Sequence, residues 1–122
     1  MKAPHLLIGA WAEEQAIFYL QTQGIKILHT NWRNKRAEID IIIETKKGAA
    51  FVEVKYRNTT YFGKPNLAIT KKKETMMQEA AEAFMQQFSM YEEIRFDIIT
   101  IEGNARDAKL NYFKDAFFPN NC

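Results

Sequence analysis

The sequence predicts an α/β domain whose elements follow the order helix, three strands, helix, two strands. Apolar or small residues recur at helical spacing in two stretches, over residues 8–20 and 76–88. Segments with the composition of strands, separated by turns and loops, lie at 25–33, 38–44, 49–56, 94–101 and 108–113. The 122 residues can enclose one hydrophobic core but not two, so we expect a single domain over residues 1–122.

The first helical stretch, which ends at Gly24, carries an acid at the border of its buried face. On a helical projection Glu14 faces water, whereas Glu13 lies at the edge of the apolar stripe, on the side of Leu20 and Gly9. Gly9 leaves room there for another backbone. Glu13 can therefore enter a site between this helix and the sheet, although a helix-edge glutamate with no role fits the same spacing.

The two central strands read as one β-hairpin that turns at Thr45–Gly48. A turn centred on its two lysines places Asp40 directly opposite Glu53, with Cβ atoms about 4.5–5.5 Å apart. Because side chains alternate along a strand, Glu53 and Lys55 share one face. The hairpin thus brings an acid from its first strand next to a Glu-x-Lys pair on its second.

Two carboxylates at this separation repel each other and are costly to bury, so a cation is expected between Asp40 and Glu53. Lys55 is one candidate for that cation, and a bound divalent ion is the other. Carboxylate oxygens in a chain with few His and Cys suit Mg²⁺ or Mn²⁺. A lone Glu-x-Lys would instead indicate an ion pair at a solvated sheet edge, but the acid in register on the partner strand favours a site.

Positive charge is concentrated around this hairpin. Residues 33–73 hold eleven of the 17 Lys and Arg but only four of the 15 Asp and Glu. A basic band around an acidic pair suits a polyanion, although a solvated surface can show the same bias.

The second helical stretch begins with three lysines behind a predicted N-cap at Thr70. Cations in a first turn oppose the helix dipole, each costing about 0.3–1 kcal/mol when exposed, which suggests phosphate binding there. Lys73 leans toward the packed side of this helix. In the long loop before it, Tyr61 and Phe62 could stack on an unpaired base or pin the loop to the core.

Cysteine usage and the N-terminus indicate a cytoplasmic protein. Cys122 is the only cysteine, which excludes intrachain disulfides and fits a reducing compartment. Residues 2–12 mimic a secretory signal, but their apolar run is short and continues into the amphipathic helix. No segment approaches the length of a membrane span, so we expect no membrane contact.

Short motifs along nearly the whole chain resemble the small bacterial YraN family, also called UPF0102. Each motif is weak, but their order and spacing together are specific. The family is similar to Holliday-junction resolvases. The resemblance implies a restriction-endonuclease-like PD-(D/E)xK core, in which a mixed sheet is flanked by helices and the acid and Glu-x-Lys motifs lie on adjacent strands. The matching residues are Gly9, Ala12-Glu13, Ala16, Tyr19-Leu20, Asn31, Arg33, Glu38-Ile39-Asp40, Phe51-Val52-Glu53-Val54-Lys55, Arg57, Phe62-Gly63, Pro65, Ala68, Lys73, Ala81, Arg95-Phe96-Asp97 and Ala116-Phe117.

The resemblance also implies roles for four residues of the site. Asp40 and Glu53 correspond to the metal ligands, with Mg²⁺ or Mn²⁺ as the cofactor, and Lys55 to the residue that orients the attacking water. Glu13 corresponds to the additional helix acid of resolvase-type members. We expect the flanking nucleic-acid backbone to be held by four cations, Arg36, Arg57, Lys64 and Lys73.

Two positions depart from the family pattern, since Ala12 and Ala37 stand where glycine is usual. If position 37 requires a positive φ, alanine there adds strain. All four residues with chemical roles are nevertheless present.

The expected function is a metal-dependent endonuclease that hydrolyses phosphodiester bonds in branched, nicked or otherwise unusual DNA, with a homodimer as one candidate assembly. One alternative is a non-catalytic nucleic-acid-binding module that keeps the nuclease fold. Another is an interaction protein in which the acid pair belongs to an ion-pair network.

Overall fold

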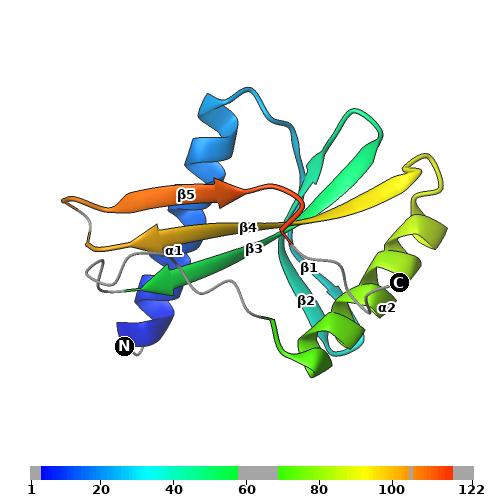
Figure 1. Cartoon of the computed structure of the whole chain (residues 1–122), viewed down its shortest axis with the longest axis horizontal. Coiled ribbons are helices and arrows are strands. Elements are labelled where there is room, and N and C mark those ends of the chain that lie inside the picture. The colour runs from blue at the N-terminus through cyan, green and yellow to red at the C-terminus, as the bar shows by residue number, and fades with distance from the viewer. Residues whose placement is uncertain (1–3, 58–68, 105, 117–122) are drawn as a thin grey trace.

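The computed structural model describes residues 4–57, 69–104 and 106–116, with the side chains of 4–7 left aside, and has the predicted order of elements (Figure 1). None of the described helices is both long and apolar enough to cross a lipid bilayer. The elements are α1 (Pro4–Thr22), β1 (Ile27–Asn34), β2 (Ala37–Glu44), β3 (Gly48–Arg57), α2 (Lys71–Gln87), β4 (Glu93–Glu102) and β5 (Lys109–Phe113).

The five strands form one mixed sheet in the order β1-β2-β3-β4-β5. Neighbouring strands are antiparallel except β3 and β4, which run parallel because α2 connects them and returns the chain to the same end of the sheet. This mixed sheet with flanking helices is the arrangement that the family resemblance implies.

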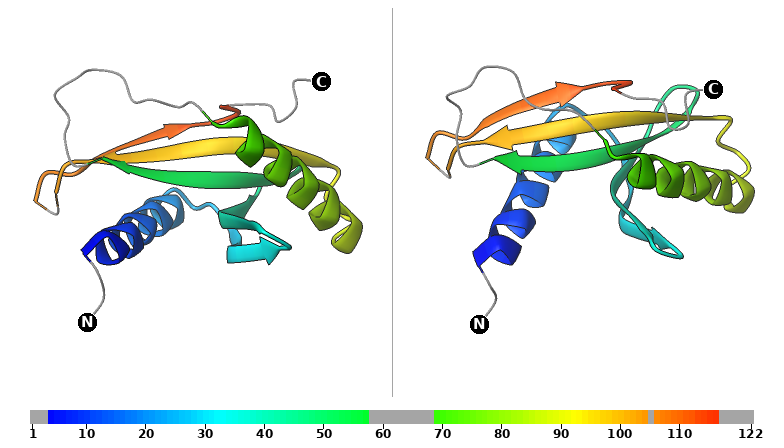
Figure 2. Two further views of the ribbon diagram at one scale, coloured as in Figure 1. Left: turned by 90° about the horizontal axis from the view of Figure 1, so that it is seen from below. Right: turned by 60° about the horizontal axis from the view of Figure 1, so that its bottom comes forward.

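The helices cover opposite faces of the sheet, and each builds its own apolar cluster (Figures 1 and 2). Alternate residues of β3 point to the two sides, with Phe51 toward α2 and Val52 toward α1. The α2 cluster includes Ala49, Phe51, Met77, Ala80, Phe84 and Phe96, and the α1 cluster includes Ala12, Ala16, Leu20, Ala50, Val52, Ile99 and Ile101.

The register of the β2–β3 hairpin is as predicted, from Glu44 opposite Ala49 to Ile41 opposite Val52. Its turn is closed twice, because the Thr45 N–H donates to the Gly48 carbonyl (2.9 Å) and the Gly48 N–H donates to Thr45 Oγ1 (3.0 Å). The ladder ends at the Ile41–Val52 pair, where β2 diverges from β3, so the predicted direct pairing of Asp40 with Glu53 does not form.

Strands β1 and β2 bend together at this point. Asn31 in β1 has a left-handed φ of 53°, a conformation that asparagine tolerates better than most residues. Along β2, Ile39 packs in the α2 cluster, whereas Ile41 packs in the α1 cluster. The faces of β2 therefore switch at Asp40, which places this acid between the two sides of the sheet.

Alanine at position 37, where the family usually has glycine, causes no backbone strain in the β1–β2 turn. The positive φ (56°) falls on Lys35, and Ala37 is a buried residue of β2 outside the left-handed region. The condition for strain at Ala37 is therefore not met, because the tight part of the turn lies two residues earlier.

Two glycines with opposite surroundings provide a test of this packing. A Cβ on Gly48 would collide with the backbone carbonyl of Glu93 in β4, whereas a Cβ on Gly9 in α1 would meet no atom within 4 Å. We expect Gly48→Ala to lower the free energy of unfolding by about 1–3 kcal/mol through overpacking. Gly9→Ala should raise it by up to about 1 kcal/mol through helix propensity. Urea unfolding of both variants measures the difference, and equal shifts of the same sign would contradict the close β3–β4 contact.

Candidate active site

Asp40 in β2 contacts the stretch of β3 that carries Glu53. The Oδ2 atom of Asp40 accepts a hydrogen bond from the Val54 N–H (2.9 Å), so its carboxylate lies beside the residue that follows Glu53. Glu53 is 9% exposed, and strand alternation turns it toward α2 with Phe51. The bend in β2 lets Asp40 make this contact in place of a regular ladder bond.

Burial and the neighbouring acids raise the proton affinity of Asp40. The pKa of Asp40 rises from its ordinary 3.8 to about 7, chiefly through burial and further through the negative charges of Glu53 and Glu13. The Val54 N–H bond and the positive charge of Lys73 act in the opposite direction. Ionising Asp40 is therefore unfavourable unless further positive charge enters the site.

The cation that contacts Glu53 comes from α2. Lys73 Nζ lies 2.6 Å from Glu53 Oε2, and the Glu53 side chain is the less exposed of the pair (12% against 38%). Thr70 caps the helix as predicted, since its Oγ1 accepts from the Lys73 N–H (3.2 Å). Lys73, although it lies in a first turn where positive charge is unfavourable, thus has Glu53 as its partner. The sequence indicated this only by placing Lys73 toward the packed side of the helix.

Lys55 follows Glu53 on the same face of β3 and is half-buried. Its pKa is lowered, chiefly by burial, while the charge of Glu53 acts the other way and those of Arg57 and Lys73 lower it further. The ammonium group is therefore closer to releasing its proton than an exposed lysine is.

Glu13 approaches from the opposite side of the sheet, at the border of the buried face of α1 as predicted. Burial raises its pKa, a hydrogen bond with Asn31 lowers it, and the charge of Glu38 raises it. Asn31, at the bend of β1, is thus the hydrogen-bond partner of Glu13. In the sequence, only the family motif had singled out Asn31.

A cavity of about 370 Å³ lies beside Glu13 and Asp40 and is also lined by Gly9, Val54 and Tyr56. Gly9 therefore opens onto this cavity rather than against another backbone, which corrects the expectation for that residue. The volume is sufficient for several water molecules, each of which occupies about 30 Å³ in the liquid. Asp40 thus faces the cavity on the α1 side and is also close enough to Glu53 to be affected by its charge.

The donor set fits a hard cation that keeps most of its water. Within the described part of the chain, no three side chains of His, Cys, Asp or Glu are grouped closely enough to hold an ion. Mg²⁺ typically binds through one or two carboxylates and completes its shell with water and substrate phosphate. Asp40 and Glu53 supply two carboxylates, the number of protein ligands that such an ion takes.

The remaining predicted cations are less closely grouped. Arg57 is half-buried at the end of β3, and its carbonyl accepts from the Gly103 N–H (3.0 Å). Arg36 lies in the exposed β1–β2 turn, directly before the first residue of β2. Lys64, together with Tyr61 and Phe62, falls outside the described residues.

Comparisons with known proteins identify relatives over most of the chain. A UPF0102 protein of Phocaeicola vulgatus is 36% identical over 117 residues, which cover 96% of this chain and 97% of the relative. One from a Sulfurihydrogenibium species is 41% identical over 97 residues, covering 79% and 84% of the two chains. Among solved structures, Pyrococcus furiosus SfsA in complex with Ca²⁺ is similar over 90% of this chain and 63% of its own, but a TM-score of 0.33 and 14% identity are too low to carry an argument.

The family model described as "Uncharacterised protein family UPF0102" matches residues 12–101, a span that contains Asp40, Glu53 and Lys73. This match agrees with the resemblance seen in the sequence motifs. The chain belongs to the UPF0102 family.

Proposed function

We propose that this protein is a divalent-metal-dependent nuclease that hydrolyses phosphodiester bonds in branched, nicked or otherwise unusual DNA. The observation that carries the proposal is the position of Asp40, hydrogen-bonded to the Val54 N–H beside Glu53, where burial and the Glu53 charge make its ionised form costly in the absence of added positive charge. Two carboxylates beside a half-buried lysine supply the groups that metal-assisted phosphodiester hydrolysis requires.

Asp40 and Glu53 would hold the Mg²⁺ or Mn²⁺ ion. When bound, such an ion neutralises charge on the scissile phosphate and makes a nearby water more acidic. Asp40 stays fixed for this purpose by its bond to the Val54 N–H, and Glu53 is fixed by burial. The cavity beside Glu13 supplies water to the site.

The two lysines would divide the remaining work. Lys55 shares a strand face with Glu53, and its lowered pKa suits a group that orients the attacking water and, as the neutral amine, accepts a proton from it. Lys73 begins in an ion pair with Glu53, and a competing cation at that carboxylate would release its ammonium group toward the substrate phosphate. Lys73 would then act on the DNA backbone.

The same ion pair favours one alternative, a nucleic-acid-binding module that does not cleave. Lys73 already neutralises Glu53, so one of the two acids is satisfied without any metal. The two functions are separated by a screen of branched, flapped and nicked DNA substrates with Mg²⁺ or Mn²⁺, in which the Asp40→Ala protein serves as the inactive control.

The raised pKa of Asp40 predicts the pH dependence of stability in metal-free buffer. A carboxyl with a folded-state pKa near 7 binds its proton more tightly in the folded than in the unfolded chain. Stability should therefore fall as the pH rises from about 4 to 7, by up to about 4 kcal/mol. Asp40→Asn keeps an acceptor for the Val54 N–H and should remove most of this fall. Urea unfolding at pH 4 and pH 8 measures it, with the exposed Asp107→Asn as control; parallel losses in all three proteins would contradict the assignment.

Metal binding should appear as thermal stabilisation. Mg²⁺ or Mn²⁺ that binds only the folded state adds about 2.7 kcal/mol at 100 times its dissociation constant. We expect the melting temperature of the wild type to rise by several degrees under those conditions. Asp40→Asn should lose this response, whereas Asp107→Asn should keep it. A shift of the same size in the Asp40 variant would place the ion elsewhere on the protein.

Substitutions of Lys55 and Lys73 should have different effects on the cleavage rate and on DNA affinity. Lys55→Ala should abolish cleavage of a substrate identified in the screen and leave DNA affinity nearly unchanged. Lys73→Ala should weaken binding to all sequences and reduce the salt slope of affinity by about one unit, with single-turnover cleavage at saturation largely kept. Binding titrations and single-turnover assays test both. Cleavage by Lys55→Ala at the wild-type rate would rule out the nuclease mechanism.

A further inference from the structure

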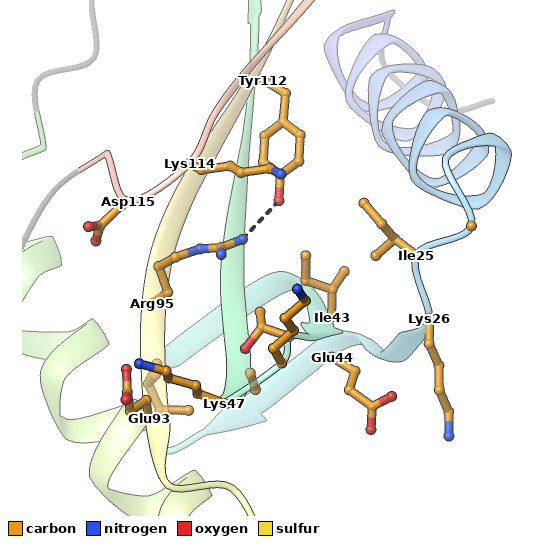
Figure 3. Close-up of a pocket in the computed structure, with 15 residues that line it drawn as sticks. Ile25, Lys26, Ile43, Glu44, Lys47, Glu93, Arg95, Tyr112, Lys114 and Asp115 are labelled. Carbon is orange, nitrogen blue, oxygen red and sulfur yellow. Dashed lines mark hydrogen bonds between the residues drawn. The ribbon is translucent and has the colours of Figure 1, made fainter.

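An open groove of about 970 Å³ lies on the α1 side of the sheet, at the end opposite the acid site (Figure 3). Its walls come from the segment between α1 and β1, the β2–β3 turn, the start of β4 and the end of β5. Five lining residues are basic and three are acidic. The side chains of Lys26, Glu44 and Asp115 extend away from its centre, so the cations that face it belong to the other walls.

The β2–β3 turn fixes two of these cations, Lys46 and Lys47. Both are exposed, and the turn that carries them is closed by the two Thr45–Gly48 hydrogen bonds. Because a side chain at Gly48 would collide with Glu93, the turn is also pressed against the start of β4. A pair of lysines on a rigid turn loses little backbone entropy when it binds an anion.

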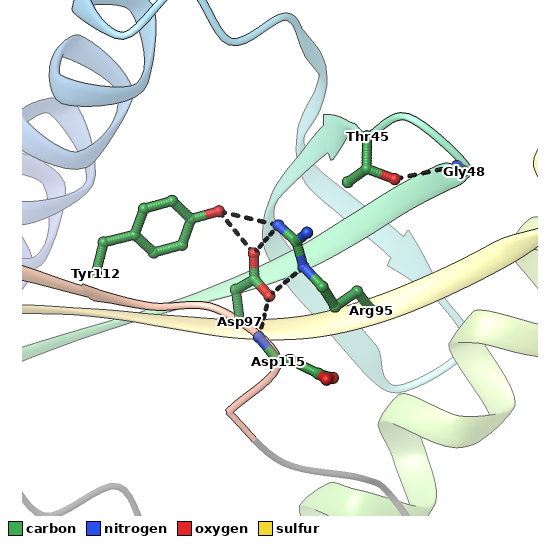
Figure 4. Close-up of polar contacts among 6 residues, drawn as sticks. All are labelled: Thr45, Gly48, Arg95, Asp97, Tyr112 and Asp115. Carbon is green, nitrogen blue, oxygen red and sulfur yellow. Dashed lines mark hydrogen bonds and ion pairs between the residues drawn. The ribbon is translucent and has the colours of Figure 1, made fainter.

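Arg95 is oriented by a buried carboxylate at the floor of the groove (Figure 4). Its Nε and Nη2 groups donate to the two oxygens of Asp97 at 2.8 Å each, and Asp97 is fully buried. Tyr112 donates to the same carboxylate (2.6 Å), and the Asp115 N–H donates to its other oxygen (2.8 Å). Asp97 is thereby saturated, and Arg95 is held in one orientation.

This arrangement leaves one end of the guanidinium available. The Nη1 group of Arg95 has no hydrogen-bond partner among the described residues, and the side chain is 31% exposed. Lys114 lies close by, with its Nζ 5.7 Å from the centre of the Tyr112 ring. A positioned guanidinium with flanking lysines matches a phosphate oxygen better than mobile surface charges do.

Strand β3 connects the groove to the acid site. It begins at the Lys46–Lys47 turn and carries Glu53 six positions after Lys47. At about 3.3 Å per residue the separation along the strand is about 20 Å. Along the axis of a duplex, which rises about 3.4 Å per nucleotide of each strand, that distance corresponds to about six nucleotides.

We propose that this groove is a second binding surface for the sugar-phosphate backbone of nucleic acid. It holds a segment of DNA about 20 Å from the bond at Asp40 and Glu53, through Lys46, Lys47 and Arg95. The inference rests on the proposed function, and it adds that the substrate extends past the acid site toward the β2–β3 turn. Contacts of this kind position the DNA without reading its sequence.

The test compares two double variants that remove equal charge from exposed positions. Lys46→Gln/Lys47→Gln alters the groove, whereas Arg106→Gln/Lys109→Gln alters the β4–β5 connection at the other end of the sheet. Binding of a fluorescein-labelled, nicked 24-base-pair duplex is followed by anisotropy from 50 to 200 mM salt, without metal. We expect the groove variant to lose about two units of salt slope and the control less than one. Unchanged melting temperatures verify that both proteins are folded.

The outcomes distinguish this inference from the function on which it rests. Tight, salt-dependent binding by the wild type with no change in the groove variant would overturn the groove and leave the nuclease proposal standing. Equal losses in both variants would also overturn it, because net charge alone would explain them. If the wild type fails to bind the duplex at any salt concentration, both proposals fail. Lys46→Glu/Lys47→Glu, with twice the charge change, should weaken binding further.

Discussion

The burial of Asp40 beside a second carboxylate, Glu53, is the constraint on which the arrangement of the site depends. Asp40 of β2 lies beside Glu53 of β3, and burial intensifies the unfavourable effect of their charges. The fold counters it with one hydrogen bond to the backbone and one ion pair to Lys73. The first contact lies where β2 diverges from β3, and the second lies in the first turn of α2.

Neighbouring elements are adapted to this arrangement. Thr70 caps α2 so that its first turn, and with it Lys73, starts above β3. On the other side of the sheet, the left-handed residue Asn31 bends β1 and provides a partner for Glu13. A more regular β1–β2 hairpin would keep Asp40 in the ladder, and its carboxylate would not reach the Val54 N–H.

The sequence was sufficient for the element order and the hairpin register, because both follow from short-range periodicity and a compact polar turn. The partner of Glu53 was not predictable from the same patterns. The alternation of side chains along β3 places Lys55 on the same face as Glu53, but no local rule specifies where a helix such as α2 starts relative to that strand. The switch of faces at Asp40 was also missed, since it depends on one left-handed φ at Asn31, and asparagine does not by itself indicate that conformation.

The parallel pairing of β3 with β4 has a consequence for the order of assembly. Asp40 and Glu53 belong to one hairpin, whose closure is local and takes microseconds in typical proteins. The ten β3–β4 pairs join residues 45 positions apart, and their formation waits for the whole connection through α2. Before that, the two acids would already be neighbours without Lys73 beside them. During folding, the hairpin would therefore tend to bind a proton or another cation, and α2 would later replace part of that charge.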